Sequence, residues 1–256
     1  MDTKLKDRVV LVTGSSFGVG EKIASAFVGE GARVISNGRH VPSRSVGCAF
    51  EQADITDPGS VRAMFESIAR NFGHLDVLVN NAGGLETFGT MEGLTDEDWQ
   101  RTFDLNCLGA MRCSRAGVPL LAQSDQPRIV NIASMSAISV GRFNHHYGAA
   151  KAALKHLGKS LSITCAPHGI LVNTVCPSTL DEGEWHQNIA DRAKREGISL
   201  EEAETLTRKE ESAKSPLGRI GTAEDLASLV VFLASGVNQF ITGQCICVDG
   251  GGSRSV

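Results

Sequence analysis

The glycine-rich segment at residues 13–20, Thr-Gly-Ser-Ser-Phe-Gly-Val-Gly, constrains the fold of this chain more than any other feature. It follows an apolar, β-branched run at residues 9–12 and opens an amphipathic stretch at about residues 18–30. A second apolar run at residues 33–36 completes the pattern of a strand, a helix and a parallel strand. Glycines permit a tight turn, and the start of a helix offers free N–H groups to a pyrophosphate. The segment therefore predicts a dinucleotide-binding site.

The same rhythm repeats along the chain. Further strands are predicted at residues 46–52, 76–79, 128–132, 171–175 and 244–248, and helices near residues 57–72, 95–122, 147–166 and 222–234. Thr95 and Thr222 precede acidic residues as helix caps do. Solidly apolar strands are typical of a parallel sheet covered on both faces. No Pro-, Gly- or Ser-rich linker divides the 256 residues, so we expect one α/β domain over residues 1–256, a doubly wound parallel sheet of the Rossmann type.

One stretch departs from this rhythm. Residues 178–215 are polar and rich in Glu, Lys and Arg, and they contain two candidate helices, near residues 184–195 and 200–214. Long excursions after the carboxyl end of a strand are often lids or substrate loops. We expect a lid whose charges face solvent; the alternative is that these charges recognise a charged carrier.

Composition excludes several classes of protein. With 41% hydrophobic and 21% charged residues and a net charge of −4, the chain is expected to be globular rather than disordered. Lys and Arg are scattered, which argues against a nucleic-acid partner. No apolar run approaches the roughly 20 residues of a membrane helix, and the charged start leaves no room for a signal peptide. We expect a soluble protein.

The seven cysteines indicate a compartment. Their number is odd and none forms a CxxC pair, so a reducing, cytoplasmic location is expected. Cys245 and Cys247 are two residues apart on a predicted strand and therefore share a face. We interpret them as small buried hydrophobic residues.

The residues after the second predicted strand bear on the choice of cofactor. A carboxylate there would bind the ribose 2′-hydroxyl of NAD, whereas an arginine accommodates the 2′-phosphate of NADP. Residues 36–40 read Ser-Asn-Gly-Arg-His, with no carboxylate. Arg39 and the adjacent His40 favour NADP(H), with NAD as the second choice. The alternative is a solvated surface arginine, because Phe17 occupies a loop position that could have carried a basic residue.

A candidate catalytic group lies in the second half of the chain. Tyr147, the single tyrosine, and Lys151 are four residues apart at the start of a predicted helix and share one face. A phenol with a pKa near 10 is a poor acid–base catalyst at neutral pH, but a nearby ammonium stabilises the phenolate. Ser134 follows the predicted strand at residues 128–132, where ligands bind at the carboxyl edge of such sheets. Ser136 is a rival that local sequence does not separate from it.

Six motifs occur in a fixed order. They are Thr13-Gly14-(x)3-Gly18-x-Gly20, Asn80-Asn81-Ala82-Gly83, Asn106, Ser134, Tyr147-(x)3-Lys151 and Val248-Asp249-Gly250-Gly251. With these motifs the chain resembles the short-chain dehydrogenase/reductase family from about Lys6 to Gly251.

The resemblance implies a role for each catalytic position. Tyr147 would exchange a proton with the substrate oxygen, and Lys151 would favour its phenolate and bind the nicotinamide ribose. Ser134 meets the family spacing of 13 residues before the tyrosine and would orient the substrate oxygen. Asn106 would hold a water that links Lys151 to solvent. The structural alternatives are a helix kink at Asn106 and a sheet hydrogen bond at Asn80.

The resemblance also implies a cofactor-binding set, in which Asp54 and Ile55 border the adenine. Its members are Gly14, Ser15, Ser16, Phe17, Gly18, Val19, Gly20, Arg39, His40, Asp54, Ile55, Asn81, Ala82, Gly83, Tyr147, Lys151, Pro177, Ser178 and Thr179. Two positions depart from the family: Ser178 replaces the usual glycine after Pro177, and Glu182 stands where a threonine commonly bonds the nicotinamide carboxamide. Thr179 is a candidate substitute.

Family substrates range from acyl-carrier-protein thioesters to sugars, polyols, steroids and simple ketones. Predicted pocket residues are Gly84, Leu85, Glu86, Met135, Val140, Phe143, His145, His146, Thr179 and Trp185. The two histidines lack a suitably spaced third ligand, so no metal site is expected.

We expect an NADP(H)-dependent oxidoreductase that interconverts a ketone and a secondary alcohol, with 3-oxoacyl reductase activity as the leading interpretation. The alternatives are an NAD-dependent dehydrogenase of a sugar, polyol or steroid alcohol, and a non-catalytic NADP-binding sensor or scaffold. The resemblance implies a homotetramer, or a dimer, through the apolar helices near residues 95–122 and 147–166 and the C-terminal strand. The alternative is that those helices simply face the sheet.

Overall fold

Seven short strands, all parallel, pair in the order β3-β2-β1-β4-β5-β6-β7. The computed structural model describes residues 2–42, 47–183 and 185–253. The strands are β1 (Val9–Val12), β2 (Arg33–Gly38), β3 (Ala49–Gln52), β4 (Val77–Asn80), β5 (Arg128–Ile132), β6 (Leu171–Pro177) and β7 (Cys245–Val248). This order confirms the predicted doubly wound parallel sheet. The strand predicted at residues 46–52 begins only at Ala49, and its residue Val46 lies outside the described residues.

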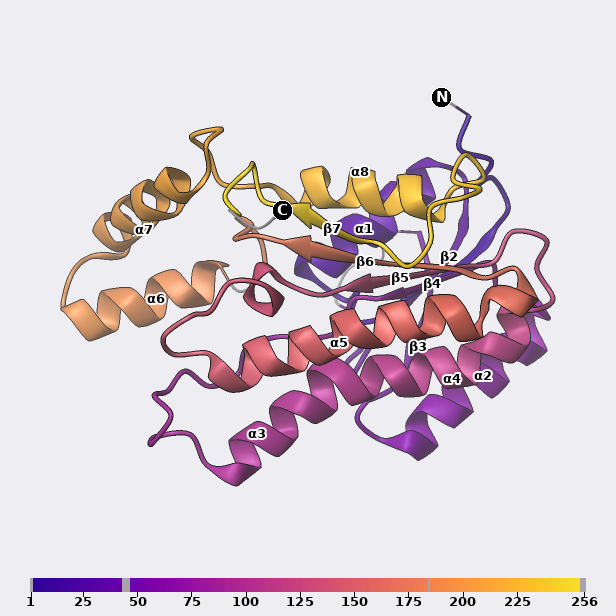
Figure 1. The fold of residues 1–256 in the computed structure, drawn as a ribbon, viewed down its shortest axis with the longest axis horizontal. Helices are drawn as coiled ribbons and strands as arrows, with labels where there is room; N and C mark the ends of the chain where they lie inside the picture. Colours follow the sequence, from indigo (N-terminus) through magenta and orange to yellow (C-terminus); the bar gives the residue numbers. More distant parts are fainter. Residues whose placement is uncertain (1, 43–46, 184, 254–256) are drawn as a thin grey trace.

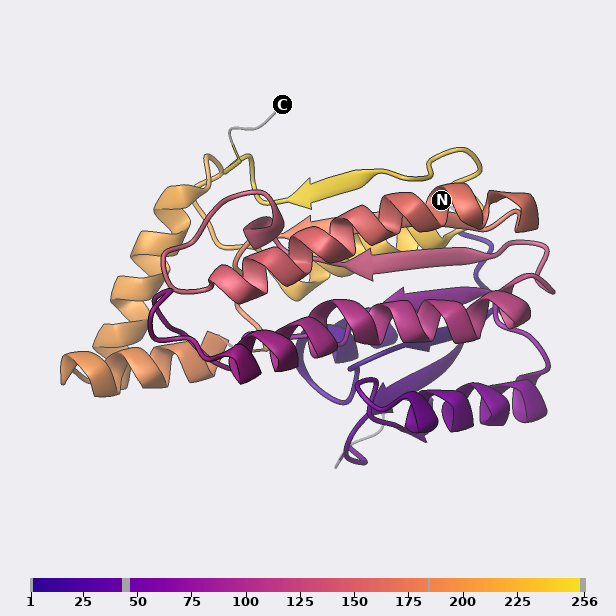
Figure 2. The same cartoon turned by 60° about the horizontal axis from the view of Figure 1, so that its bottom comes forward.

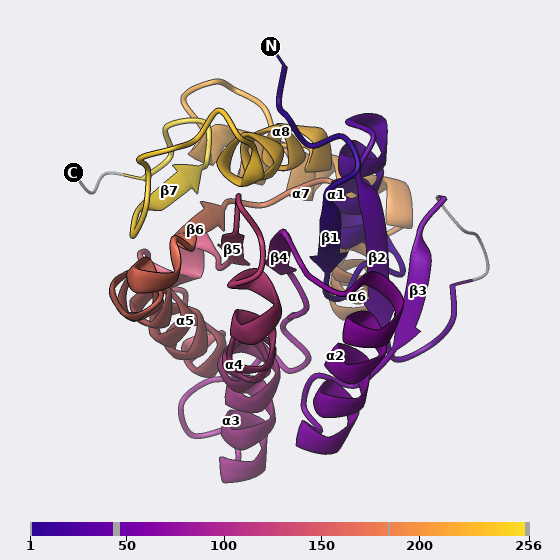
Figure 3. The ribbon, with the colours of Figure 1, turned by 90° about the vertical axis from the view of Figure 1, so that its right-hand side faces the viewer.

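Helices cover both faces of the sheet (Figures 1 and 3). One face carries α1 (Gly18–Gly29) and α8 (Ala223–Ala234), and the other carries α2 (Pro58–Phe72), α4 (Gly109–Leu121) and α5 (His145–Thr164). Along β1, Val10 and Val12 pack with α1 and α8, whereas Val9 and Leu11 pack with α2 and α4. Because both faces are buried, the strand is apolar at every position rather than at alternate ones.

The helical stretch predicted at residues 95–122 is not one continuous α-helix. It comprises α3 (Asp96–Phe103), the π-helical turn η1 (Asp104–Leu108) and α4. The backbone N–H of Gly109 donates to the carbonyl of Asp104, five residues back, and the Asn106 side chain donates to the Thr102 carbonyl at 3.0 Å. The π-helical turn therefore contains Asn106, the residue at which a helix kink was the structural alternative. At the start of α3, Thr95 forms the predicted cap.

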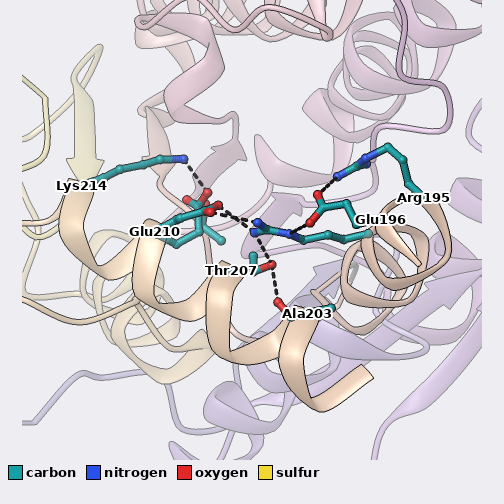
Figure 4. A network of polar contacts seen from close by, with 9 residues as sticks. Arg195, Glu196, Ala203, Thr207, Glu210 and Lys214 are labelled. Atoms are coloured by element: carbon teal, nitrogen blue, oxygen red, sulfur yellow. Dashed lines mark hydrogen bonds and ion pairs between the residues drawn. The ribbon is translucent and has the colours of Figure 1, made fainter. Parts of the chain in front are cut away.

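The polar excursion forms a helical hairpin of α6 (Trp185–Glu196) and α7 (Leu200–Lys214). Figures 1 and 2 show it beyond the ends toward which the strands point. Arg192 joins the two helices: it pairs with Glu210 at 2.7 and 2.9 Å, bonds Thr207 at 3.0 Å, and bonds Glu196 on its own helix (Figure 4). The helix predicted at residues 184–195 includes position 184, which lies outside the described residues.

The exposed edge of the sheet carries the two C-terminal cysteines. Cys245 is exposed and Cys247 is half-buried on β7. The interpretation of Cys245 as a buried hydrophobic residue is therefore wrong, because an edge strand has neighbours on one side only. Among the described residues, no helix combines the length and apolar character needed to cross a bilayer.

Candidate active site

A cavity of about 830 Å³ lies at the carboxyl ends of the strands. The glycine-rich loop, the loops after β4 and β5, the start of α5 and the hairpin all contribute to its wall. The predicted cofactor and catalytic residues in the wall are Gly14, Phe17, Gly18, Val19, Gly20, Asn81, Gly83, Ser134, Tyr147, Lys151, Pro177, Ser178 and Thr179. Residues distant in the sequence thus meet at one site, because parallel strands bring their ends to the same edge.

The glycine-rich loop has the geometry of a phosphate cradle. Gly14 and Gly18 have φ angles of +61° and +59°, which favour glycine. A Cβ atom on Gly20 would lie 2.2 Å from the Gly14 carbonyl oxygen, so no side chain fits there. Phe17 gives α1 no side-chain cap, which leaves the N–H groups of its first turn to a ligand. These features fit a pyrophosphate at the start of α1.

The end of β2 lies beside this loop. Asn37 is buried, and its side chain accepts from the Gly14 N–H and donates to the carbonyls of Glu51 and Ala53. A Cβ atom on Gly38 would lie 2.8 Å from the Ser16 hydroxyl oxygen. Arg39 follows directly and is exposed. Ser16 and Arg39 therefore flank the position where the adenosine ribose is expected.

Lys151 is a buried ammonium beside the tyrosine. Its side chain is 3% exposed, its Nζ donates to the Ile132 carbonyl at 3.0 Å, and it lies 5.6 Å from the centre of the Tyr147 ring. Gly148 brings α5 close to the loop after β5, because a Cβ atom there would lie 2.9 Å from the Ser136 carbonyl oxygen. A buried positive charge next to a phenol favours the phenolate.

The two candidate serines have similar hydrogen bonds. Ser136 accepts a hydrogen bond from the Asn144 side chain at 3.2 Å, and Ser134 accepts one from the Ser136 backbone N–H at 3.1 Å. Both serines line the cavity. Because each hydroxyl oxygen accepts one hydrogen bond, each hydroxyl keeps its proton to donate to a substrate oxygen. The choice of Ser134 therefore rests on the family spacing to Tyr147.

We expect Ser134→Ala to lower turnover roughly tenfold, because it removes one hydrogen bond to the reacting oxygen, worth about 1.5 kcal/mol. Ser136→Ala is the matched control and should change turnover less than threefold. Steady-state kinetics of both variants measures this difference. A larger loss in Ser136→Ala would reverse the assignment.

Asn106 anchors the loop after β4. Its Oδ1 accepts from the Gly84 N–H at 2.9 Å, and its Nδ2 donates to the Gly84 carbonyl at 2.9 Å. A Cβ atom on Gly83 would lie 2.7 Å from Asn106 Oδ1 and 2.9 Å from Lys151 Nζ, so both groups border one glycine. Asn106 positions this wall of the site. Asn80 bonds Asn131 on the neighbouring strand β5 at 2.8 Å, as its structural alternative predicts, and Ser114 on α4 at 3.0 Å.

Glu182, which departs from the family pattern, and Thr179, the candidate substitute, both contact other elements. The Thr179 hydroxyl donates to Glu211 on α7 at 2.8 Å. The Glu182 carboxylate lies 3.6 Å from Lys22 on α1, next to the glycine-rich loop. Both side chains therefore connect the segment after β6 to neighbouring helices. Because the Thr179 hydroxyl already donates to Glu211, its hydrogen bond does not support the prediction that Thr179 binds the nicotinamide carboxamide.

Several predicted site residues lie outside the cavity wall. For the cofactor these are Ser15, Ser16, Arg39, His40, Asp54, Ile55 and Ala82, for the substrate they are Glu86, Phe143, His145 and His146, and for catalysis it is Asn106. Ser15 is buried and donates to the Val12 carbonyl, and Asp54 accepts from Thr56. His146 is fully buried and packs 6.0 Å from Trp99, because position 146 faces α3 when position 147 faces the cavity. Among the described residues, no cluster suited to a metal ion occurs.

Sequence reasoning missed part of the wall. The missed polar and aromatic residues are Phe88, Ser139, Asn144, Asn188, Glu211, Lys214, Ser215, Arg219, Asp249 and Ser253. They lie on loops, the hairpin and the C-terminal segment, whose positions no sequence period predicts. Only Asn144 could have been found from the sequence, because asparagine is common at the N-cap of a helix. Asn144 does occupy the N-cap of α5, but its side chain bonds Ser136 rather than the backbone of the helix.

Comparisons with known proteins identify the chain. A family profile described as enoyl-(acyl carrier protein) reductase matches residues 14–253. Galactitol 2-dehydrogenase of Agrobacterium fabrum is 33% identical over 97% of this chain and 98% of its own length. The chain belongs to the short-chain dehydrogenase/reductase family. The recognition of that family from its motifs is confirmed, and the chain is an NAD(P)-dependent oxidoreductase acting on CH–OH groups.

Other members of the short-chain dehydrogenase/reductase family differ in their substrates. The 3-oxoacyl-[acyl-carrier-protein] reductase of Escherichia coli is 33% identical over 95% of this chain and 96% of its own length. The crystal structure of L-sorbose reductase from Gluconobacter frateurii with NADPH and L-sorbose has a TM-score of 0.93 at 29% identity and covers both chains fully. Thus family membership leaves the substrate open.

Proposed function

We propose that this protein uses NADP(H) to interconvert a ketone and a secondary alcohol. The observation that carries the proposal is the group of Tyr147, Lys151 and Ser134 at one cavity, with the lysine buried. The glycine-rich loop and the start of α1 would hold the cofactor, with Asn81 and Gly83 along its path. The nicotinamide supplies or accepts the hydride when bound.

The chain's own residues handle the proton and the charge. In the reducing direction, the Tyr147 hydroxyl donates its proton to the carbonyl oxygen, and Ser134 donates a hydrogen bond to the same atom. The Lys151 ammonium stabilises the phenolate that remains. In the oxidising direction the phenolate takes the proton of the alcohol. We propose that the α6–α7 hairpin acts as a lid over this step, because its residues Trp185 and Glu211 line the cavity.

The preference for NADP(H) rests on Arg39. It is exposed at the end of β2, and residues 36–40 carry no carboxylate that would repel a 2′-phosphate. We expect Arg39→Asp to raise the KM for NADPH roughly tenfold, since a charged hydrogen bond of about 1.5 kcal/mol is lost, and to leave the KM for NADH unchanged or lower. Arg62→Asp on the exposed face of α2 is the control, because it changes net charge equally.

An unaltered ratio of the two KM values in Arg39→Asp would show that another residue selects the cofactor. A lower KM for NADH than for NADPH in the unaltered protein would instead favour NAD, the second choice.

For the substrate, the leading candidate remains a 3-oxoacyl thioester or related carbonyl compound. Its support is a set of apolar side chains at the cavity: Phe88 and Val140 line it and are 58% and 94% exposed, and Leu85 and Met135 line it as well. Such side chains can cover an acyl chain.

A sugar or polyol is the second candidate, and a steroid alcohol falls in the same dehydrogenase class. Its specific support is the set of hydrogen-bonding side chains at the same cavity, Ser139, Asn144, Asn188 and Glu211. Galactitol 2-dehydrogenase and L-sorbose reductase, two similar proteins named after a polyol and a sugar, also favour this candidate.

Absorbance of the reduced nicotinamide distinguishes these candidates. Purified protein is mixed with NADPH and a 3-oxoacyl thioester or a ketose, or with NADP⁺ and a polyol or steroid alcohol. Turnover with the thioester alone would establish the leading candidate. If every substrate fails while NADPH still binds, the alternative of a non-catalytic NADP-binding sensor or scaffold gains support.

We further propose that the protein is a homotetramer in the cytoplasm, with a dimer as the alternative. Ile163 on α5 and Phe240 before β7 are 66% and 96% exposed, as side chains in contacts between subunits would be in an isolated chain. The seven free cysteines fit a reducing compartment. Light scattering on the eluting protein measures the assembly directly.

A further inference from the structure

The α6–α7 hairpin contributes a carboxylate to the active-site cavity. The hairpin residues in the wall are Trp185 and Asn188 from α6 and Glu211 and Lys214 from α7. On each helix the two residues are three positions apart and therefore share a face. Among the hairpin residues that the structure describes, Glu211 is the only acidic one in this wall. The hairpin thus presents one negative and one positive side chain to a ligand in the cavity.

Hydrogen bonds hold the Glu211 carboxylate in place. The Thr179 hydroxyl donates to its Oε2 at 2.8 Å, and the Lys214 ammonium donates to its Oε1. The Glu211 side chain is 20% exposed, so it is partly shielded from bulk water. A side chain that existing bonds already orient loses less rotamer freedom when it binds a ligand. The carboxylate is therefore preorganised at the wall.

Thr179 places this carboxylate near the reacting groups. It follows β6, and Ser134 follows β5, the neighbouring strand in the sheet. The Ala133 N–H donates to the Val175 carbonyl at 2.8 Å, so the two strands remain paired near these ends. Adjacent strands lie about 4.8 Å apart. A substrate bound at Ser134 therefore has the segment after β6, and the carboxylate bonded to it, on one side.

The carboxylate has acceptor positions left for a substrate. A carboxylate oxygen can accept two hydrogen bonds, and among the described residues each oxygen of Glu211 accepts one. Hydroxyl groups on adjacent carbon atoms of a sugar or polyol supply two donors for the two remaining positions. The Lys214 ammonium can in turn donate to a hydroxyl oxygen. An alkyl chain would displace water from this ion pair without replacing its hydrogen bonds, which costs free energy.

We propose that Glu211 determines the substrate class by accepting hydrogen bonds from the hydroxyl groups of a sugar or polyol. This inference rests on the proposed function and selects the sugar or polyol from its candidates. The reacting carbon–oxygen group lies at Ser134 and Tyr147, and Glu211 binds hydroxyl groups farther along the same molecule. An acyl chain has no donor for the carboxylate. Thr179, Glu211 and Lys214 lie outside the helices and the C-terminal strand through which subunits are proposed to pair, so the site does not depend on the assembly.

Matched ketones test the proposal with NADPH as the reductant. Dihydroxyacetone, ketopentoses and ketohexoses of both hands are each compared with the straight-chain 2-ketone of the same length. We expect the hydroxylated member of at least one pair to have a kcat/KM at least about tenfold higher, because a site built to bind hydroxyl groups rejects an analogue that lacks them. In Glu211→Gln, kcat/KM should fall about tenfold for that ketose and much less for its plain ketone.

Two further variants sharpen this comparison. Glu201→Gln removes the same charge from an exposed position on α7 outside the cavity wall and should leave both kinetic constants unchanged. Glu211→Asp keeps the charge but withdraws the carboxylate by one methylene group, so it should lose preference for the ketose as Glu211→Gln does. Melting temperatures and NADPH affinities of all three variants provide the control for folding.

Binding without turnover separates this inference from the proposed function. NADPH and a polyol do not react with each other, so titration calorimetry of sorbitol, galactitol or xylitol into the protein–NADPH complex measures affinity alone. We expect Glu211→Gln to weaken polyol binding about tenfold and Glu201→Gln to leave it unchanged.

The outcomes distinguish the two hypotheses. Turnover of plain ketones or of a 3-oxoacyl thioester with no preference for ketoses, or an unchanged polyol affinity in Glu211→Gln, would overturn the role of Glu211 and leave the proposed function intact. Polyol binding that depends on Glu211, with no turnover of any carbonyl compound, would overturn the proposed function instead. Absence of both turnover and polyol binding would overturn both.

Discussion

Replacing Tyr147 with phenylalanine is expected to lower turnover by roughly a thousandfold, because the variant keeps the ring and loses the proton donor. General acid–base catalysis is worth about 10²–10⁴ in rate. The Lys151 ammonium would keep its bond to the Ile132 carbonyl, so the cofactor side of the site should be unchanged. We expect NADPH to bind with the wild-type affinity. Turnover is followed by nicotinamide absorbance, and binding by quenching of tryptophan fluorescence.

The combination of the two measurements makes this test specific. Lost turnover with retained binding supports the proton-transfer role. Retained turnover would refute the proposed chemistry for every substrate candidate, since all of them share this step. Lost binding together with lost turnover would instead assign Tyr147 a structural role. The melting temperature of the variant provides the control for folding.

Replacing Gly20 with alanine is expected to weaken NADPH binding about a hundredfold. The added Cβ atom would lie 2.2 Å from the Gly14 carbonyl oxygen and 2.5 Å from the Asn81 side chain. The start of α1 would have to move away from the loop, at a cost of about 3 kcal/mol. The N–H groups that would face the pyrophosphate move with it. Isothermal titration with NADPH measures the loss.

Gly29→Ala supplies the matched control on the same helix. A Cβ atom on Gly29 would have no neighbour within 4 Å, and alanine favours a helix over glycine by up to about 1 kcal/mol. We therefore expect unchanged NADPH affinity and a slightly higher melting temperature. If Gly20→Ala bound NADPH normally, the loop would not be the phosphate cradle.

Much of the fold follows from local sequence. The apolar runs, the glycine-rich loop and the caps at Thr95 and Thr222 predicted the elements and their parallel arrangement, because each signal lies within a few neighbouring residues. Several elements, such as β1, β5 and α7, have the predicted bounds, and the ends of the others shifted by one to three residues. The break at Asn106 was not predicted as a π-helical turn, since it depends on a hydrogen bond to Gly84, 22 residues away.

The sequence predicted some residues of the candidate site and misplaced others. Tyr147, Lys151 and Ser134 came from spacing and from resemblance to a family, and the structure gathers them at one cavity. His145 and His146 were expected in the pocket because they adjoin the tyrosine in sequence. On a helix, adjacent residues point in different directions, and His146 packs against Trp99 instead.

The sequence by itself determined the class of fold, and it predicted the candidate dinucleotide site and the candidate catalytic residues, because these depend on periodicity, short spacing and family resemblance. Only the tertiary structure decided that Thr179 bonds Glu211, that Glu182 lies beside Lys22, and that Cys176 touches Cys245. Each of these depends on side chains from segments far apart in the chain, whose approach is set by packing across the sheet and hairpin.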